Sequence, residues 1–142
     1  MSLWILDTDH VSLSQHFHPN VIQRSTLIPP EFLFTTIITV EEQMKGWLNA
    51  IRQASPNPAS SKLVWAYEGL KDAVGYFNVS NVLSFEPEAQ EIFVTLRREV
   101  RIGFQELRIA AIALSQGGII VTRNRKDFEK VPGLQLEDWT VQ

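Results

Sequence analysis

Short apolar segments that alternate with long stretches of helical periodicity constrain the fold of this chain most strongly. Residues 3–6 (LWIL) and 119–122 (IIVT) are unbroken apolar or β-branched runs, and residues 32–39 (FLFTTIIT) are rich in β-branched and aromatic side chains. Short runs of this kind are typical of strands that are covered on both faces. Strands separated by helices predict an α/β fold, in which a central parallel sheet carries helices on both sides.

The segments between these strands show the spacing of amphipathic helices. Helices are expected over residues 40–51, 59–77, 86–101 and 105–116. Pro56 and Pro58 separate the first two, which predicts a helical hairpin. Gly117 and Gly118 follow the last helix and are expected to form its C-cap.

The remaining segments carry weaker signals. Residues 11–17 are expected to begin a helix that is capped by Thr8 or Asp9. Prolines at 19, 29 and 30 bound a segment to which we assign no element. Further short elements are expected as a strand at 81–85, a helix or turn at 123–128, and a turn followed by an edge strand at 131–139.

Length and composition favour one globular domain spanning residues 1–142. The chain has no cysteine, which excludes a disulfide framework and thiolate zinc sites. Neither a signal peptide nor an apolar run of about 18 residues is evident. We therefore expect a soluble, cytoplasmic protein without a membrane segment.

Charge is unevenly distributed along the chain. Residues 1–96 hold 5 Lys/Arg and 10 Asp/Glu, a net charge of −5, whereas residues 97–130 hold 8 Lys/Arg and 4 Asp/Glu, a net charge of +4. The basic third is either an ordinary solvated surface or a patch that binds phosphates beside an acidic site.

Acidic and amide side chains follow the predicted strands. Asp7 follows the first strand, the pair at positions 41 and 42 follows the second, and Asn124 and Asp127 follow residues 119–122. Glu106 stands at the start of an apolar helix. Parallel strands bring such residues to one edge of the sheet, where α/β folds place their sites. Oxygen donors without His or Cys suit a hard cation such as Mg²⁺ or Mn²⁺, which typically serves phosphoryl chemistry.

Each of these residues also has a structural explanation. Asp7 could cap a helix, and Thr39 with Glu42 fits a capping box, so spacing alone does not choose between Glu41 and Glu42 as a ligand. Glu106 could simply answer the helix dipole. Asn124 could be the N-cap of a short helix, with Asp127 as an acid in its first turn.

Histidine and tryptophan add no further site. His10, His16 and His18 cluster near the N-terminus without the spacing of helical ligands, and we assign them no catalytic role. The tryptophans are expected to anchor the core or an interface.

Three motifs taken together resemble a protein family. The segments WILDTDHVSL, TTIITVEEQMKGW and ELRIAAIALSQGGIIVTRNRKDFEKVPGLQLEDW are similar to PIN domains, in particular to VapC-type toxin ribonucleases of type II toxin–antitoxin pairs. The resemblance covers the whole chain in order. It implies a three-layer α/β/α fold, a Mg²⁺- or Mn²⁺-dependent endoribonuclease, a homodimer, and a cognate antitoxin protein that blocks the site.

The resemblance also implies site residues. Asp7, Glu42 and Glu106 match the metal-binding acids, which selects Glu42 over its neighbour. Asn124 occupies the fourth position, often Asp in the family, and Asp127 is the nearest acid that could assist it. Small hydroxyl positions that orient a ligand or water fall on Thr8 and Thr122. Residues that could face RNA phosphates are Arg123, Arg125 and Lys126, and the arginines could alternatively contact the antitoxin.

Two departures from the family pattern weaken the predicted site. Glu106 is one methylene longer than the usual Asp, and Asn124 lacks a charge but keeps a carbonyl oxygen. We therefore expect weaker metal binding, and activity that is lower or favours Mn²⁺. Two alternatives follow: a PIN-like module that binds antitoxin or RNA without cutting, and a phosphoacceptor receiver domain. The second is disfavoured because no Asp follows a central strand in the middle of the chain.

Overall fold

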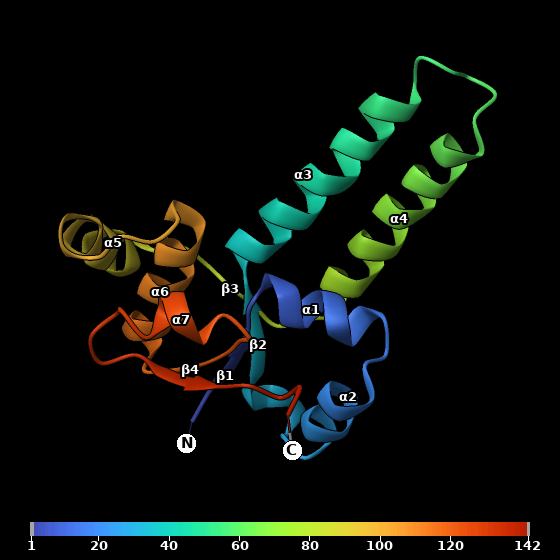
Figure 1. Ribbon diagram of the computed structural model, residues 1–142. Coiled ribbons are helices and arrows are strands. Elements are labelled where there is room, and N and C mark those ends of the chain that lie inside the picture. The colour runs from blue at the N-terminus through green and yellow to red at the C-terminus, as the bar shows by residue number, and fades with distance from the viewer. Residues whose placement is uncertain (1, 142) are drawn as a thin grey trace. The chain divides into compact units, whose positions relative to one another are not determined.

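A computed structural model describes residues 2–141, and its strands form one parallel sheet (Figure 1). The strands are β1 (Trp4–Leu6), β2 (Leu33–Thr36), β3 (Val82–Leu83), β4 (Ile119–Val121) and β5 (Gln135–Glu137). They lie in the order β3-β2-β1-β4-β5, and each neighbouring pair is parallel. The predicted α/β class is confirmed, and the last strand lies at an edge as expected.

Helices connect the strands in the predicted alternation. They are α1 (Thr8–Gln15), α2 (Pro19–Thr26), α3 (Ile37–Ala54), α4 (Ser61–Asn78), α5 (Pro87–Glu99), α6 (Phe104–Gln116) and the short α7 (Arg125–Phe128). A 3-10 turn at Pro30–Phe32 precedes β2. The sequence had left α2 without an assigned element.

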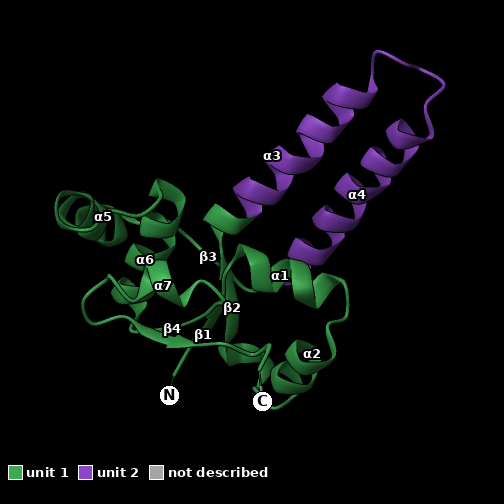
Figure 2. Cartoon of the chain, in the orientation of Figure 1, with its two compact units in different colours: residues 1–39, 81–142 green, residues 40–80 purple. Residues whose placement is uncertain are grey.

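The chain divides into two compact units (Figure 2). Residues 1–39 and 81–142 form unit 1, which holds the sheet, and residues 40–80 form unit 2, which holds the helical hairpin. The hairpin is confirmed within unit 2. A single domain over residues 1–142 stays a prediction.

The core of unit 1 explains the almost wholly apolar sequence of α6. Its buried residues pack with Ile5 of β1, Ile120 of β4 and residues of α5 in one cluster. Leu6 and Val121, one position further along each strand, are buried outside this cluster. Because neighbouring side chains on a strand point to opposite faces, both faces of the central strands are covered. Gly117 ends α6 in the left-handed conformation (φ 63°), which confirms the predicted C-cap.

Two element boundaries differ from the prediction. Helix α1 begins at Thr8 and is capped by Asp7, whose carboxylate accepts the His10 amide, so neither Thr8 nor Asp9 is the cap. The strand predicted over residues 32–39 covers Leu33–Thr36, and α3 begins at Ile37. The Thr36 hydroxyl accepts the Thr39 amide at 3.3 Å. The capping box of Thr39 and Glu42, one of the two alternatives for Glu42, does not fit this start of the helix, because Thr39 lies inside it.

The hairpin of unit 2 is held by a close aromatic contact. Trp47 of α3 and Trp65 of α4 meet edge to face, with ring centroids 5.0 Å apart. Gly69, one turn further along α4, lies under the Trp47 ring, and a Cβ atom at this position would come within 2.2 Å of it. The absence of a side chain at Gly69 therefore lets the two helices approach.

Substitution of Gly69 tests this packing. Gly69→Ala is expected to lower the free energy of unfolding by about 1–3 kcal/mol, because the Trp47 ring must move. Gly75→Ala in the same helix meets no atom within 4 Å and is expected to stabilise the protein by about 0.5–1 kcal/mol. Chemical denaturation of both variants measures the difference, and equal behaviour would contradict the packing argument.

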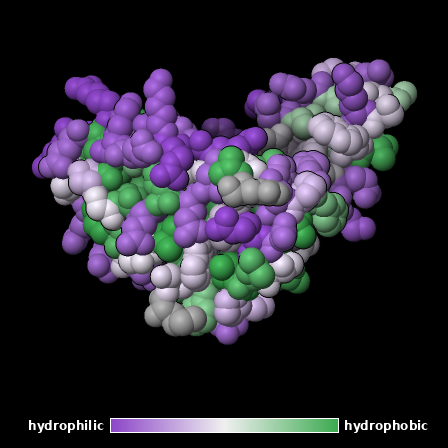
Figure 3. All heavy atoms as spheres, turned by 60° about the horizontal axis from the view of Figure 1, so that its bottom comes forward, coloured by the Kyte–Doolittle hydropathy of each residue, from purple (hydrophilic) through white to green (hydrophobic). Residues whose placement is uncertain are grey.

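None of the helices in the described residues combines the length and apolar character needed to cross a membrane. On the face drawn in Figure 3, hydrophilic side chains cover most of the area and hydrophobic groups lie between them.

Candidate metal centre

The site lies where the chain reverses its direction of travel across the sheet. From β1 the chain moves outward to β2 and β3, and it then returns to the opposite side of β1 for β4 and β5. The Asp7 amide donates to the Val121 carbonyl at 3.1 Å, and the Thr122 amide donates to the Glu137 carbonyl at 2.8 Å. Asp7 and Thr122 therefore stand just beyond β1 and β4, at the same edge of the sheet. This is the position at which open α/β sheets place their ligands.

Asp7 combines the two roles that its sequence position allowed. Its Oδ1 accepts the His10 amide at 2.8 Å, so it caps α1. The residue is only 7% exposed, and it keeps a carboxylate beside the sheet edge. A buried carboxylate needs compensating charge or hydrogen bonds, which is consistent with a site that accepts a cation.

Glu106, Asn124 and Asp127 meet directly. The Asn124 Nδ2 donates to Glu106 Oε2 in a close hydrogen bond and to Asp127 Oδ2 at 3.2 Å. Asn124 stands at the N-cap position of α7, but its side chain makes no capping hydrogen bond. Its backbone amide instead donates to the Thr122 hydroxyl at 2.8 Å. The asparagine side chain therefore bridges two acids rather than closing the helix.

The electrostatics of Glu106 show that acids crowd together here. Burial raises the pKa of the Glu106 carboxyl above its usual value, and the carboxylates of Asp127 and Asp7 raise it further. Hydrogen bonds with the Gly103 backbone and the Asn124 amide oppose this rise in the pKa. A bound cation would offset the repulsion among these carboxylates.

A second group of possible ligands adjoins Asp7. Ligand atoms of Asp7, Asp9 and His10 lie within 4.8 Å of one another. The Asp9 carboxylate is engaged, however, because Arg123 Nε and Nη2 each donate to it at 2.7 Å. This two-fold ion pair ties the start of α1 to the loop after β4.

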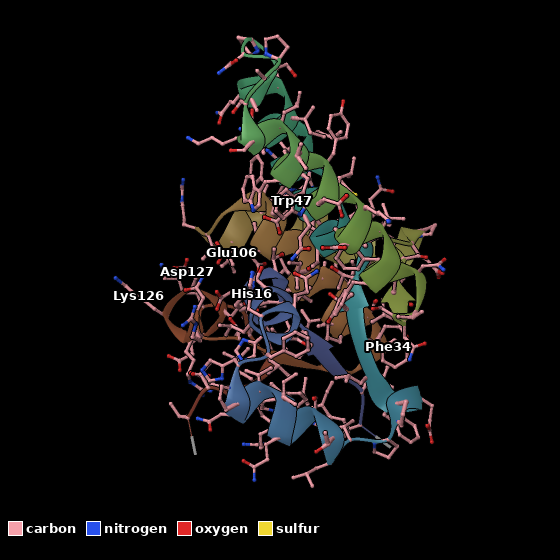
Figure 4. The ribbon with its side chains drawn as sticks, turned by 90° about the vertical axis from the view of Figure 1, so that its right-hand side faces the viewer. His16, Phe34, Trp47, Glu106, Lys126 and Asp127 are labelled. Carbon is pink, nitrogen blue, oxygen red and sulfur yellow. The ribbon has the colours of Figure 1, made fainter. Side chains whose placement is uncertain are left out.

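The predicted RNA-facing residues have different surroundings. Arg123 is bound to Asp9, and Arg125 pairs with Glu129 at 3.3 Å. Lys126 is exposed, and Figure 4 shows it projecting outward, beyond Asp127 and Glu106. Their part in RNA binding stays a prediction.

Thr8 and Thr122 form hydrogen bonds within the chain next to the candidate site. The hydroxyls of Thr8 and Thr39 lie 3.0 Å apart and form a hydrogen bond, which joins the first turns of α1 and α3. The fully buried Thr122 accepts the Asn124 amide as described above. Both hydroxyls predicted to orient a ligand therefore position backbone segments in this structure.

Glu42 belongs to unit 2, where it lies in α3 and is half-buried, whereas its neighbour Glu41 is exposed. The place of Glu42 in the site rests on the family resemblance and stays a prediction.

The oxygen donors around Asn124 and at Asp7 are of the kind that a hard divalent cation prefers. Asp7, Glu106 and Asp127 offer carboxylate oxygens, and Asn124 offers a carbonyl oxygen if its amide turns over. Such an all-oxygen set suits Mg²⁺ or Mn²⁺ and disfavours softer metals.

Replacing Asn124 with aspartate tests whether the uncharged side chain at this position weakens metal binding. Asn124→Asp is expected to raise Mn²⁺ affinity roughly tenfold, because a further carboxylate adds ligand charge. The same change should lower the melting temperature of the metal-free protein, because it removes a donor to Glu106 and Asp127 and adds a like charge. Calorimetry with Mn²⁺ and thermal melts measure both effects. Asn57→Asp, at an exposed turn, is the control, and similar behaviour of the two variants would contradict this account.

Sequence reasoning missed two features of this site. The pairing of Asp9 with Arg123 joins residues 114 positions apart, which spacing cannot show. His10 is fully buried and lies one helical turn after Asp7. Its position three residues after a helix-capping acid was the available signal.

Comparisons with known proteins agree with the fold and the resemblance. No protein-family model matches the chain. DNA-bound VapBC from Salmonella typhimurium is 24% identical and shares the fold, with a TM-score of 0.78 over 98% of this chain and 99% of that one. A toxin-antitoxin complex from Klebsiella pneumoniae has a TM-score of 0.67 at 22% identity, over 92% of this chain and 93% of that one.

The sequence comparison shows the family as well as the fold. The chain is 32% identical over 143 residues to Ribonuclease VapC1 of Haemophilus influenzae strain R2866. The matched residues cover 97% of this chain and 98% of the relative. Identity at this level over nearly the full length of both proteins shows that the chain belongs to the VapC family of PIN-domain ribonucleases.

Proposed function

We propose that this protein is the toxin of a type II toxin–antitoxin pair, a metal-dependent endoribonuclease that hydrolyses phosphodiester bonds in RNA. Residues 1–142 would act as one PIN domain. The observation that carries the proposal is the cluster of Glu106, Asn124 and Asp127 beside Asp7 at the carboxyl edge of β1 and β4. Membership of the VapC family, whose relative is named a ribonuclease, supplies the substrate class.

The proposed metal ligands are Asp7, Glu42 and Glu106, acting directly or through water. When bound, Mg²⁺ or Mn²⁺ would supply charge stabilisation to the phosphate and make an adjacent water more acidic. The structure supports the two ligands in unit 1, because hydrogen bonds hold the carboxylates of the buried Asp7 and the half-buried Glu106 in place.

The remaining residues would orient water and RNA. Asn124 can present either its amide hydrogens or its carbonyl oxygen to an attacking water. Asp127 accepts a hydrogen bond from the Asn124 amide and so helps to orient it. Thr8 and Thr122 keep the surrounding backbone in place. Arg123, Arg125 and Lys126 would contact the flanking phosphates. Single-stranded loops are the expected targets, because an A-form duplex hides its base edges in a deep groove.

Partners follow from the structural relatives. The Klebsiella pneumoniae neighbour is a toxin-antitoxin complex, which supports a cognate antitoxin protein for this chain as well. We further propose a homodimer, and action in the cytoplasm, where RNA targets are found.

A cleavage assay tests the proposal. Purified protein without antitoxin is incubated with a structured RNA in Mn²⁺, in Mg²⁺, and in either metal with excess EDTA. Internal cuts in unpaired loops with metal, and none with EDTA, are the expected result. Cleavage that persists unchanged in EDTA would contradict metal dependence.

One observation favours a second candidate, the module that binds without cutting. The Asn124 amide already satisfies both Glu106 and Asp127, so the acids have an internal partner that competes with a cation. Intact RNA in the same assay, together with no heat on titration of millimolar Mn²⁺, would favour this candidate over the nuclease.

A further inference from the structure

His10 is buried in unit 1 between the proposed metal centre and the C-terminal segment. Its side chain is 0% exposed, and its Nδ1 has no hydrogen-bond partner among the described residues. Asp7 Oδ1 lies 3.5 Å from this nitrogen. Polar atoms this deeply buried are normally paired, so an unpaired one indicates a group held ready for a function.

The other ring nitrogen of His10 defines the tautomer. The Trp139 backbone amide donates to Nε2 at 3.3 Å. Asp138 Oδ1 is 3.8 Å from the same nitrogen, and it already accepts the Thr140 amide and hydroxyl at 2.9 and 2.6 Å. Because Nε2 accepts a hydrogen bond, the neutral ring carries its proton on Nδ1. Asp7 Oδ1 lies 3.5 Å from this nitrogen without forming a hydrogen bond to it.

This tautomer argues against His10 as a metal ligand, although its ring lies among possible ligands. A protonated Nδ1 has no lone pair to offer a cation. The third member of that group, Asp9, is held by Arg123. On the side of Asp7 the neutral ring therefore offers a hydrogen-bond donor and not a metal-binding lone pair.

We infer that His10 is a positioning residue, whose Nδ1–H orients the Asp7 carboxylate for the metal and couples it to the C-terminal segment. This inference rests on the proposed function. Asp7 Oδ1 already accepts the His10 backbone amide at 2.8 Å, and it lies 3.5 Å from the ring Nδ1. A small movement of the carboxylate would therefore add a hydrogen bond from the ring to the one from the backbone. Hydrogen bonds behind a ligating carboxylate fix its direction and commonly change metal affinity by about 10- to 100-fold when they are lost.

The C-terminal segment anchors the far side of the ring. Trp139 is fully buried, and its Nε1 donates to Glu137 Oε1 at 3.0 Å. The Asn20 amide holds the next residue by donating to the Thr140 carbonyl at 2.7 Å. Residues 137–140 thus hold the acceptor side of His10 in place, although they lie about 130 positions from Asp7 along the chain.

Two isosteric substitutions separate positioning from packing. Asparagine places its amide nitrogen near the His10 Nδ1 position and keeps a donor toward Asp7, whereas glutamine reaches the Nε2 position and keeps an acceptor for Trp139. Both variants are expected to lower the melting temperature of the metal-free protein. His10→Asn should bind Mn²⁺ within about threefold of the parent, whereas His10→Gln should bind it about 10- to 100-fold more weakly. Calorimetry gives the affinities, and RNA cleavage at saturating Mn²⁺ gives the rates. Equal affinities for the two variants, or a stronger loss in His10→Asn, would overturn the inference.

A spectroscopic measurement on the unaltered protein does not depend on how well the variants fold. Nitrogen-15 chemical shifts of the His10 ring are expected to show a protonated Nδ1 and an unprotonated Nε2. The opposite tautomer would overturn the inference. If the parent binds no Mn²⁺ and cuts no RNA, the proposed function fails. If the parent does both and the two His10 variants bind Mn²⁺ equally, only the role of His10 fails.

Discussion

Replacing Asp7 with asparagine is expected to lower the rate of RNA cleavage by about 10²- to 10³-fold while leaving the fold intact. The substitution removes a carboxylate at the junction of β1 and α1 and therefore weakens the hold on the divalent ion. Asparagine is as good an N-cap as aspartate, so its Oδ1 still accepts the His10 amide. The expected loss is thus one of charge at the site, which single-turnover cleavage of a labelled RNA measures.

Asp72→Asn is the matched control for this prediction. Asp72 is exposed in α4, and the same change of charge there should leave the cleavage rate within about twofold of the parent, because isolated surface substitutions have small effects. Melting temperatures of both variants should stay close to that of the parent. If Asp7→Asn cuts as fast as the parent, Asp7 is not a metal ligand.

Replacing Glu106 with glutamine is expected to lower cleavage by about 10²-fold and to stabilise the metal-free protein at neutral pH. Burial and the neighbouring Asp127 raise the folded-state pKa of Glu106. A carboxyl whose pKa is raised in the folded state contributes stability at low pH and loses that contribution as pH rises through the folded-state value. Glutamine carries no charge at any pH, so it avoids this loss.

The pH dependence distinguishes this explanation from a general change in packing. The melting temperature of Glu106→Gln should exceed that of the parent at pH 7 without metal, and the difference should vanish below the usual glutamate pKa of about 4.3. Glu91→Gln, exposed on α5, should show no such difference. If the parent is more stable than Glu106→Gln at pH 7, the charge on Glu106 does not destabilise the metal-free fold.

Much of the fold followed from local pattern. The strands β1 and β4 are short apolar runs that are buried on both faces, and α6 is apolar because it packs in the main cluster. Gly117 marked the end of α6, since its left-handed backbone favours glycine.

Other elements depended on contacts that spacing does not reveal. Residues 37–39 are β-branched and predicted as strand, yet they form the first turn of α3 because the Thr36 hydroxyl caps it. Helix α2 is largely polar, and its buried residue is Val21. In such segments the tertiary surroundings outweigh intrinsic propensity.

For the candidate site, the sequence indicated where the polar residues lie along the elements, but not which of them contact one another. The positions of Asp7, Glu106 and Asn124 after strands or at a helix start followed from the sequence. The bridge from Asn124 to Glu106 requires α6 and β4 to return the chain to the same edge, and the contact of His10 with Trp139 spans almost the whole chain. Such links depend on the assembled fold, so a single sequence does not contain them in readable form.

The most direct test of the central claim is a calorimetric titration of Mn²⁺ into the parent and into Asp7→Asn, without RNA. Saturable binding of one ion per chain is expected in the parent, and loss of most of that binding is expected in the variant. Binding of equal strength in both proteins, or no binding in the parent, would contradict a metal centre built around Asp7.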